Sequence, residues 1–228
     1  ITEKGYCLSP ATGALDFDHA DIAADIASPE RPTSAIGYLV AAFARRAEAG
    51  APFPTVISCD NLPENGARLR SAVIALAERI DPRLAERIAS EGAFPSTMVD
   101  RIVPATTPAD LDRFADETGL FDAALVRTEP FSRWVIEDRF AGPRPPWEKG
   151  GALIVADVKP FELAKLRLLN GAHSTIAYLG YLARFEHVAD VMARPEFARF
   201  IARLQEEEIA PVTPAPESMP LRPYMAAL

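Results

Sequence analysis

The sequence has few of the features that mark specialised classes of protein. Its 228 residues include only two cysteines, Cys7 and Cys59, too few for a disulfide framework or a thiolate zinc site. A reducing cytoplasm is therefore the expected location. The formal net charge is -8 and no long basic run occurs, so the electrostatic footprint of a nucleic-acid-binding protein is missing. No apolar run reaches the roughly 18 residues of a membrane span, and we expect neither nucleic acid nor membrane as a partner.

Several catalytic and binding motifs are also absent. Neither a Gly-x-Gly-x-x-Gly nor a Gly-x-x-x-x-Gly-Lys loop occurs, so the sequence contains no phosphate cradle. There is no His-x-x-x-His or Cys-x-x-Cys pair, which makes a metal site a weak proposal and leads us to expect no bound metal. A Gly-x-Ser-x-Gly nucleophile elbow is missing as well.

What is present is the composition and patterning of a globular α/β protein. About half of the residues (49%) are apolar and 25% are charged, which is enough for a sizeable core. The patterning predicts helices at 32–48, 67–80 and 108–119, strands at 53–61, 100–107, 123–131 and 152–158, and further helices at 160–185 and 194–209. Alternating strands and helices in the first part predict a largely parallel sheet with helices on its faces.

The composition changes after Phe140, where the Pro- and Gly-rich stretch AGPRPPWEKGG begins. From Pro160 onward almost the whole chain has helical patterning. We place a domain boundary near Val158, between an α/β unit (1–158) and the start of a helical unit (159–228). The two ends, an extended-looking ITEKGY and a helix-like RPYMAAL, predict a segment of a longer protein.

The run KLRLLNGAHS, from Lys165 to Ser174, places polar side chains in a leucine-rich helix. On an ideal helix, with about 100° per residue, Lys165, Asn170 and His173 fall on one side together with Glu162 from the preceding turn. Because a polar group on a buried face is costly unless it is paired, this arc predicts a packed pocket.

Each of these side chains also has a structural interpretation. Lys165 fits a surface lysine, Asn170 a helix residue with a local hydrogen bond, and His173 a core histidine. Gly171 weakens a helix by about 1 kcal/mol relative to alanine, which fits a position where another backbone or a ligand approaches closely. Their grouping on one arc favours the pocket.

A second group of polar residues follows the strand predicted at 53–61. Asp60 and Asn61 would lie at its carboxyl end, where open α/β sheets bind ligands. The alternative is that they cap a helix or form an Asx-turn, and Asn65-Gly66 is typical of a turn. Asp100, at the start of the next predicted strand, would by itself be a solvated or capping carboxylate.

Five motifs together resemble a known family. They are ITEKGY, SCDNLPENG, FPSTMVDRIVPATT, TEPFSRWVIED and FELAKLRLLNGAHS. In this order and at these spacings they resemble the mannitol dehydrogenase family of polyol-specific long-chain dehydrogenases, which includes mannitol 2-dehydrogenases, arabinitol dehydrogenases, fructuronate reductases and tagaturonate reductases. The resemblance runs from Ile1 to about Arg203. It implies the C-terminal part of a Rossmann-type parallel-sheet domain followed by the start of a mainly α substrate domain, with the glycine-rich loop upstream of this chain.

The resemblance also implies roles for individual residues. Lys165 would be the general acid/base, Asn61 and Asn170 would hydrogen-bond the C2 oxygen, His173 would orient the substrate, Asp100 would bind a substrate hydroxyl, Glu162 would lie on the proton path, and Thr2, Glu3 and Asn61 would contact the cofactor. The acid/base role of Lys165 is also physically reasonable. Burial disfavours the charged ammonium form, and it therefore lowers the pKa of a lysine from about 10.4 toward the working pH.

The activity implied is metal-independent hydride transfer between NAD and C2 of a polyol or sugar acid, although this chain alone is expected to be inactive. The pieces WEK and VADV favour the D-mannonate/D-fructuronate branch over mannitol/fructose. Two alternatives from other classes remain: a metal-dependent hydrolase or lyase built on Asp60, Asp100 and His173, and a non-catalytic packing module.

Overall fold

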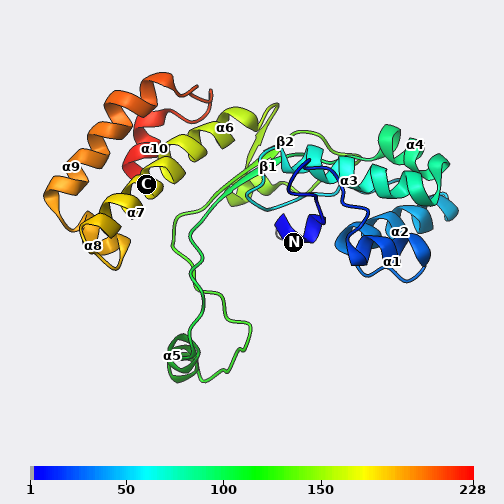
Figure 1. Ribbon diagram of the computed structural model, residues 1–228, viewed down its shortest axis with the longest axis horizontal. Coiled ribbons are helices and arrows are strands. Elements are labelled where there is room, and N and C mark those ends of the chain that lie inside the picture. The colour runs from blue at the N-terminus through cyan, green and yellow to red at the C-terminus, as the bar shows by residue number, and fades with distance from the viewer. Residues whose placement is uncertain (1–2) are drawn as a thin grey trace.

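The computed structural model describes residues 3–228 as two helical groups joined by a small sheet, with an arm projecting from the sheet (Figure 1). In chain order the elements are η1 Glu3–Tyr6, α1 Ala20–Ala27, α2 Ala35–Glu48, α3 Asn65–Ile80, α4 Pro82–Glu91, β1 Thr97–Asp100, α5 Pro108–Thr118, β2 Arg133–Glu137, η2 Trp147–Gly150, β3 Leu153–Val155, α6 Lys159–Ala164, η3 Lys165–Asn170, α7 Gly171–Leu182, α8 Val188–Met192, α9 Pro195–Arg203, η4 Leu204–Ile209, η5 Ala210–Val212 and α10 Leu221–Ala227.

The first helical group encloses the largest of three hydrophobic clusters among the described residues. In α2 the Ser34 side chain caps the helix by accepting a hydrogen bond from the Gly37 N–H, which explains why the helix predicted from residue 32 begins three residues later. Ile36, Val40 and Phe43 then recur at helical spacing and are buried. The helices predicted at 32–48 and 67–80 are confirmed as α2 and α3.

The sheet has three strands in the order β1-β2-β3 and is mixed. β1 pairs with β2 in antiparallel register, and β2 pairs with β3 in parallel register. The prediction of a largely parallel sheet is therefore wrong for this part of the chain. The reason is the arm: the chain leaves β1, runs out to α5 and returns directly into the neighbouring strand, which reverses its direction (Figure 1).

Of the four predicted strands, two are displaced along the chain and one is reduced to a single bridge. Segments 100–107 and 123–131 form the two sides of the arm, while the strands lie at Thr97–Asp100 and Arg133–Glu137. The strand predicted at 53–61 makes only an isolated parallel bridge between Thr55 and Ala93. The strand predicted at 152–158 is confirmed in its centre, as β3.

The arm ends in α5, whose start is fixed by local hydrogen bonds. Thr107 and Asp110 form a capping box, and Gly119 ends the helix in the left-handed conformation with φ 72°. The helix predicted at 108–119 is confirmed. Ile102 and Phe121 are exposed apolar side chains of the arm, and they are 60% and 72% accessible.

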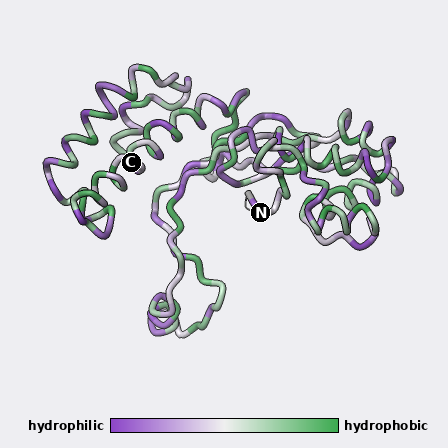
Figure 2. Tube along the Cα trace, in the orientation of Figure 1, coloured by the Kyte–Doolittle hydropathy of each residue, from purple (hydrophilic) through white to green (hydrophobic). Residues whose placement is uncertain are grey.

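The C-terminal group consists of helices in which hydrophilic and hydrophobic stretches alternate along the chain (Figure 2). Met98 and Val135 of the sheet pack against Phe161, Leu168 and Tyr224 of these helices in a second hydrophobic cluster. This cluster joins the sheet to the helical group. No helix among residues 3–228 combines the length and the apolar character that crossing a membrane requires.

Candidate active site

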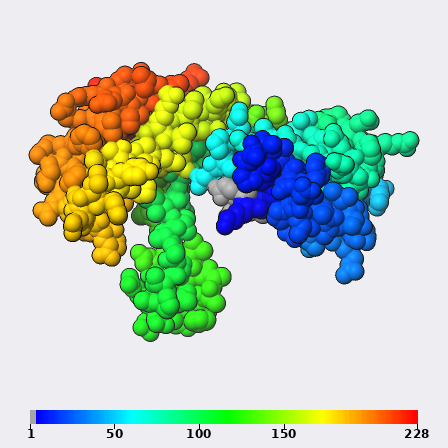
Figure 3. All heavy atoms as spheres, in the orientation of Figure 1, coloured from blue at the N-terminus to red at the C-terminus, as the bar shows by residue number. Residues whose placement is uncertain are grey.

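A pocket lies where the loop after residue 59 meets β1 and the continuous helix formed by α6 and η3. Its volume is about 150 Å³. The space-filling view shows the cyan segment that contains the loop beside the yellow-green helix on one face of the molecule (Figure 3). Four of the residues predicted for the site line this pocket: Asn61, Glu162, Lys165 and Asn170.

Lys165 is held by two acceptors from different parts of the chain. Its Nζ donates to Asn61 Oδ1 at 2.7 Å and to the Val99 carbonyl oxygen at 2.7 Å. A neutral lysine amine has two N–H bonds and one lone pair. When both N–H bonds are directed at these acceptors, the lone pair takes a remaining direction and is available to accept a proton.

The helix around Lys165 is a π-helix and not the ideal α-helix that the sequence predicts. It runs from Lys165 to Asn170, and the Gly171 N–H donates to the Leu166 carbonyl five residues earlier. In a π-helix the backbone hydrogen bonds join residues five apart, so such residues lie nearly above one another along the helix. This brings Asn170 onto the side of Lys165, closer than the α-helical arc places it.

Burial moves the pKa values of the pocket groups toward neutrality. Desolvation lowers the pKa of Lys165, and the negative charge of Asp100 opposes this effect. Desolvation raises the pKa of Glu162, although the Glu64 N–H donates to its carboxylate at 3.2 Å and works against the rise. Shifts in these directions, caused by burial, are typical of groups that transfer protons in active sites.

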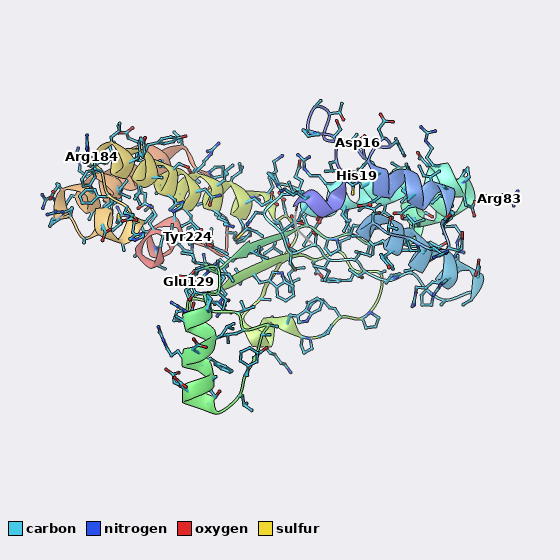
Figure 4. The ribbon with its side chains drawn as sticks, turned by 60° about the horizontal axis from the view of Figure 1, so that its bottom comes forward. Asp16, His19, Arg83, Glu129, Arg184 and Tyr224 are labelled. Carbon is cyan, nitrogen blue, oxygen red and sulfur yellow. The ribbon has the colours of Figure 1, made fainter. Side chains whose placement is uncertain are left out.

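Asp100 lies beside the pocket rather than in its lining. Its side chain is buried and accepts a hydrogen bond from the Tyr224 hydroxyl at 3.0 Å. Desolvation raises the pKa of Asp100, and the Tyr224 bond and the charges of Lys165 and Arg133 lower it. Figure 4 shows Tyr224 near Glu129, where the arm leaves the sheet.

The loop that carries Asn61 is anchored by its neighbour. Asp60 is buried, its carboxylate accepts from the Tyr6 and Ser58 hydroxyls, and its Oδ1 accepts from the Leu62 N–H at 2.9 Å. That last bond is the Asx-turn considered as an alternative for this residue. Asp60 therefore holds the loop, while Asn61 is the residue that faces Lys165.

Two further positions differ from expectation. Asn65-Gly66 is not a turn but the start of α3, and Asn65 is fully buried. The side-chain amide of Asn65 makes two hydrogen bonds with the backbone of Thr97. Its Oδ1 accepts from the Thr97 N–H at 2.9 Å, and its Nδ2 donates to the Thr97 carbonyl oxygen at 3.1 Å. A Cβ on Gly66 would meet the Phe94 carbonyl oxygen at 2.5 Å, so the close approach occurs here. At Gly171 a Cβ would meet only the Leu166 oxygen, at 3.7 Å.

One predicted residue lies outside the pocket lining, and two others fall at the start of the chain. His173 is exposed and does not line the pocket, because it lies about one turn farther along the helix than Asn170, where the lining ends. Thr2 lies outside the described residues, and Glu3 is described only as the start of η1. Sequence reasoning missed Asn65 and Tyr224, whose partners are distant in the chain, and only the Asn-Gly pair drew attention to the first.

The described residues hold no group of three or more His, Cys, Asp or Glu side chains placed to bind a metal ion. The alternative of a metal-dependent hydrolase or lyase on Asp60, Asp100 and His173 therefore finds no ligand set in residues 3–228. Asp60 is bonded to hydroxyls and His173 is exposed on another element.

Known family models match both parts of the chain. The family model described as the mannitol dehydrogenase Rossmann domain matches residues 1–149, and the model of the mannitol dehydrogenase C-terminal domain matches residues 157–228. The D-mannonate oxidoreductase of Escherichia coli (strain K12) is 48% identical over 228 residues, which are 100% of this chain and 47% of that protein.

Two solved structures have the same fold over the whole chain. D-sorbitol dehydrogenase in substrate-free form is 37% identical with a TM-score of 0.94, and the match covers 100% of this chain and 47% of that one. The Pseudomonas fluorescens mannitol 2-dehydrogenase in ternary complex with NAD and D-mannitol is 38% identical with a TM-score of 0.86, covering 100% and 46%.

The chain spans about half the length of the curated relatives it matches. The expected fold class, a part of a Rossmann-type α/β domain followed by a mainly α part, is confirmed. The two family models together cover nearly all of the sequence, and the chain therefore belongs to the mannitol dehydrogenase family.

Proposed function

We propose that the protein containing this chain is an NAD-dependent, metal-independent oxidoreductase that interconverts a secondary alcohol and a ketone at C2 of a sugar acid or polyol. The observation that carries the proposal is the Lys165 amine, whose two N–H bonds are directed at Asn61 and Val99 and whose pKa is lowered by burial. An amine held in this way at a pocket can take the proton of a bound hydroxyl.

The pocket residues fit the nicotinamide end of the cofactor. Leu62 and Met98 line the pocket with apolar surface, and Asn61 adds an amide beside them. These residues would hold the nicotinamide, with Thr2 and Glu3 proposed as further contacts from the family resemblance. NAD, when bound, supplies the hydride acceptor for alcohol oxidation.

The chain's own residues handle the substrate and its proton. Lys165 Nζ takes the proton from the C2 hydroxyl, and the alkoxide character that develops at this oxygen is stabilised by the amides of Asn61 and Asn170. The Oδ1 of Asn61 accepts a hydrogen bond from Lys165, so the Nδ2 of Asn61 is free to donate to the C2 oxygen of the substrate. Glu162, which lines the pocket one helical turn before Lys165, would pass the proton to solvent.

Two substrate contacts lie farther from Lys165. Asp100 would accept a hydrogen bond from a substrate hydroxyl, and its interaction with the charge of Lys165 supports a place near the reacting centre. His173 would orient the substrate from the rim, because it is exposed one turn beyond Asn170. We also propose that residues 1–158 belong to the nucleotide domain and 159–228 to the substrate domain.

The preferred substrate pair is D-mannonate and D-fructuronate. The support is the 48% identity to the Escherichia coli D-mannonate oxidoreductase over the whole chain. The pair D-mannitol and D-fructose is the second candidate, favoured by the 38% identity to the enzyme bound to NAD and D-mannitol. The free cysteines, Cys7 and Cys59, suit a reducing compartment, and the cytoplasm is the proposed location.

The test uses the full-length protein and follows NADH consumption with D-fructuronate and, separately, with D-fructose. We expect turnover with at least one ketone and a higher kcat/KM for D-fructuronate. The same assay with EDTA should give the same rates. If neither ketone consumed NADH, or if activity vanished with EDTA and returned with a divalent ion, the proposed function would be wrong.

A further inference from the structure

Arg133, the first residue of β2, carries a buried hydrogen-bond donor without an acceptor. Its Nη1 is shielded from solvent and has no hydrogen-bond partner among residues 3–228. No carboxylate of these residues forms an ion pair with it. An arginine donor is costly to leave unpaired away from water, so this guanidinium is suited to an acceptor that arrives with a ligand.

Arg133 lies next to a residue of the proposed site. In the antiparallel pairing of β1 and β2 it stands directly opposite Asp100, so the two side chains share one face of the sheet. The Arg133 guanidinium carbon lies 4.9 Å from the ring centroid of Tyr224, whose hydroxyl donates to Asp100 at 3.0 Å. The aromatic ring thus supports the guanidinium beside the carboxylate.

The sheet brings Asp100 close to two positive groups: Arg133 is its cross-strand partner, and Lys165 Nζ donates to the carbonyl oxygen of Val99, the residue before Asp100. The charges of Lys165 and Arg133 both lower the pKa of Asp100, whereas Asp100 is the charge that acts on the pKa of Lys165. The negative charge of Glu129 raises the pKa of Asp100. The Oε1 of Glu129 accepts a hydrogen bond from the Ile102 N–H at 2.6 Å, and among the described residues Glu129 forms no ion pair with Arg133. The contacts therefore run from Lys165, at the Val99 carbonyl, through the adjacent Asp100 to Arg133 opposite it.

This order matches a sugar acid whose ketone and carboxylate lie at opposite ends. We propose that Arg133 anchors the carboxylate of the substrate, while Lys165 meets the C2 oxygen and Asp100 a hydroxyl between them. The guanidinium presents a planar fork that binds a carboxylate through two hydrogen bonds, which a hydroxyl of a neutral polyol cannot match. The inference rests on the proposed function and names its substrate class.

The test compares the ratio of kcat/KM for D-fructuronate to kcat/KM for D-fructose in the full-length protein and its variants. In Arg133→Gln this ratio should fall about 10- to 100-fold, as expected for the loss of a charge-assisted hydrogen bond, with most of the change in KM for D-fructuronate. Arg133→Lys keeps the positive charge but lacks the planar fork, and its ratio should lie between those of the wild type and Arg133→Gln. Arg139→Gln, an exposed arginine just after β2, should leave the ratio unchanged.

The outcomes separate this inference from the proposed function. A parallel loss with both ketones in Arg133→Gln and Arg133→Lys, or an unchanged ratio, overturns the carboxylate anchor. Wild-type turnover of D-fructose without turnover of D-fructuronate overturns the anchor as well, while the dehydrogenase function stands. If the wild type reduces neither ketone, the proposed function itself fails. Should Arg133→Gln not fold, the ratio in Arg133→Lys decides.

Discussion

The pocket and the arm meet at β1, where Val99 lines the pocket and the arm leaves the sheet after Asp100. They are nevertheless stabilised by different kinds of contact. The pocket is built from long-range contacts, such as that between Lys165 and Asn61, which are 104 residues apart. The arm tip is held by local ones: Thr107 and Asp110 cap α5, and Arg127 pairs with Asp110 at 2.5 Å. Packing of distant segments creates the pocket, whereas the arm tip depends on its own turn and cap.

The same contrast separates the two sets of pKa shifts. Desolvation is the largest influence on Lys165 and Glu162, and it moves both values toward neutrality. Hydrogen bonds from Thr107 and Arg127 lower the pKa of Asp110 to about 2, away from neutrality. Hydrogen bonds that stabilise the charged form hold structure together, while burial that destabilises the charged form prepares groups for proton transfer.

The largest effect is expected from Lys165→Ala in the full-length enzyme. Removing the proposed base should reduce kcat by about 10²- to 10⁴-fold, with the circular dichroism spectrum unchanged. Lys149→Ala, at an exposed position in η2, is the matched control and should retain activity. A folded Lys165→Ala protein with wild-type kcat would remove Lys165 from the mechanism.

Asn61→Ala should have the next largest effect. It removes both the acceptor that orients the Lys165 amine and a proposed donor to the C2 oxygen, and loss of one such donor typically costs about 10²- to 10³-fold in kcat. Cys59→Ser, an exposed change two residues earlier, serves as the control. A rise in KM with kcat unchanged would show that Asn61 binds substrate without stabilising the reacting oxygen.

The pH dependence of alcohol oxidation should follow Lys165. The ammonium cannot accept a proton, so the rate should fall about tenfold for each pH unit below the apparent pKa. Because burial lowers the pKa of this lysine, that value should lie below the ordinary one. Measuring kcat for oxidation against pH tests this, and an apparent pKa at or above that of a free lysine would contradict the role of burial.

The sequence predicts part of the site and not its geometry. Lys165 and Asn170 stand out as polar residues in a leucine-rich helix, and both line the pocket. The π-helix between them escapes prediction, because six residues are too few to distinguish an α from a π repeat. His173 shares their side of an ideal α-helix, but it lies one turn beyond Asn170 and outside the pocket lining.

Long-range partners explain the remaining differences. Nothing in the local sequence links Tyr224 to Asp100, 124 residues away. Asn65 precedes a glycine and therefore resembles a turn residue, but its amide pairs with the backbone of Thr97. The helices were predicted well because their patterns and caps are local, and the strands poorly because the arm decides their pairing.

Gly66→Ala should destabilise the packing of α3 against residues 94–96, and it removes no chemical group of the site. The added Cβ would lie 2.5 Å from the Phe94 carbonyl oxygen and 2.6 Å from the Ser96 nitrogen, both backbone atoms. Overpacking of this kind costs roughly 1–3 kcal/mol in the free energy of unfolding, measured by urea denaturation. Gly142→Ala, where a Cβ meets nothing within 4 Å, is the control. Equal stability of the two variants would mean that residues 94–96 can move away.

The smallest effect is expected in the arm. Thr107→Ala removes the side chain that accepts from the Asp110 N–H and should cost about 1 kcal/mol. Because α5 is held by local contacts, the loss should appear as faster amide hydrogen exchange in residues 108–118, with kcat in the full-length enzyme unchanged. Ser132→Ala, at an exposed position at the root of the arm, should change neither. A fall in kcat with Thr107→Ala would show that the arm and the pocket are coupled, and the contrast between them would no longer hold.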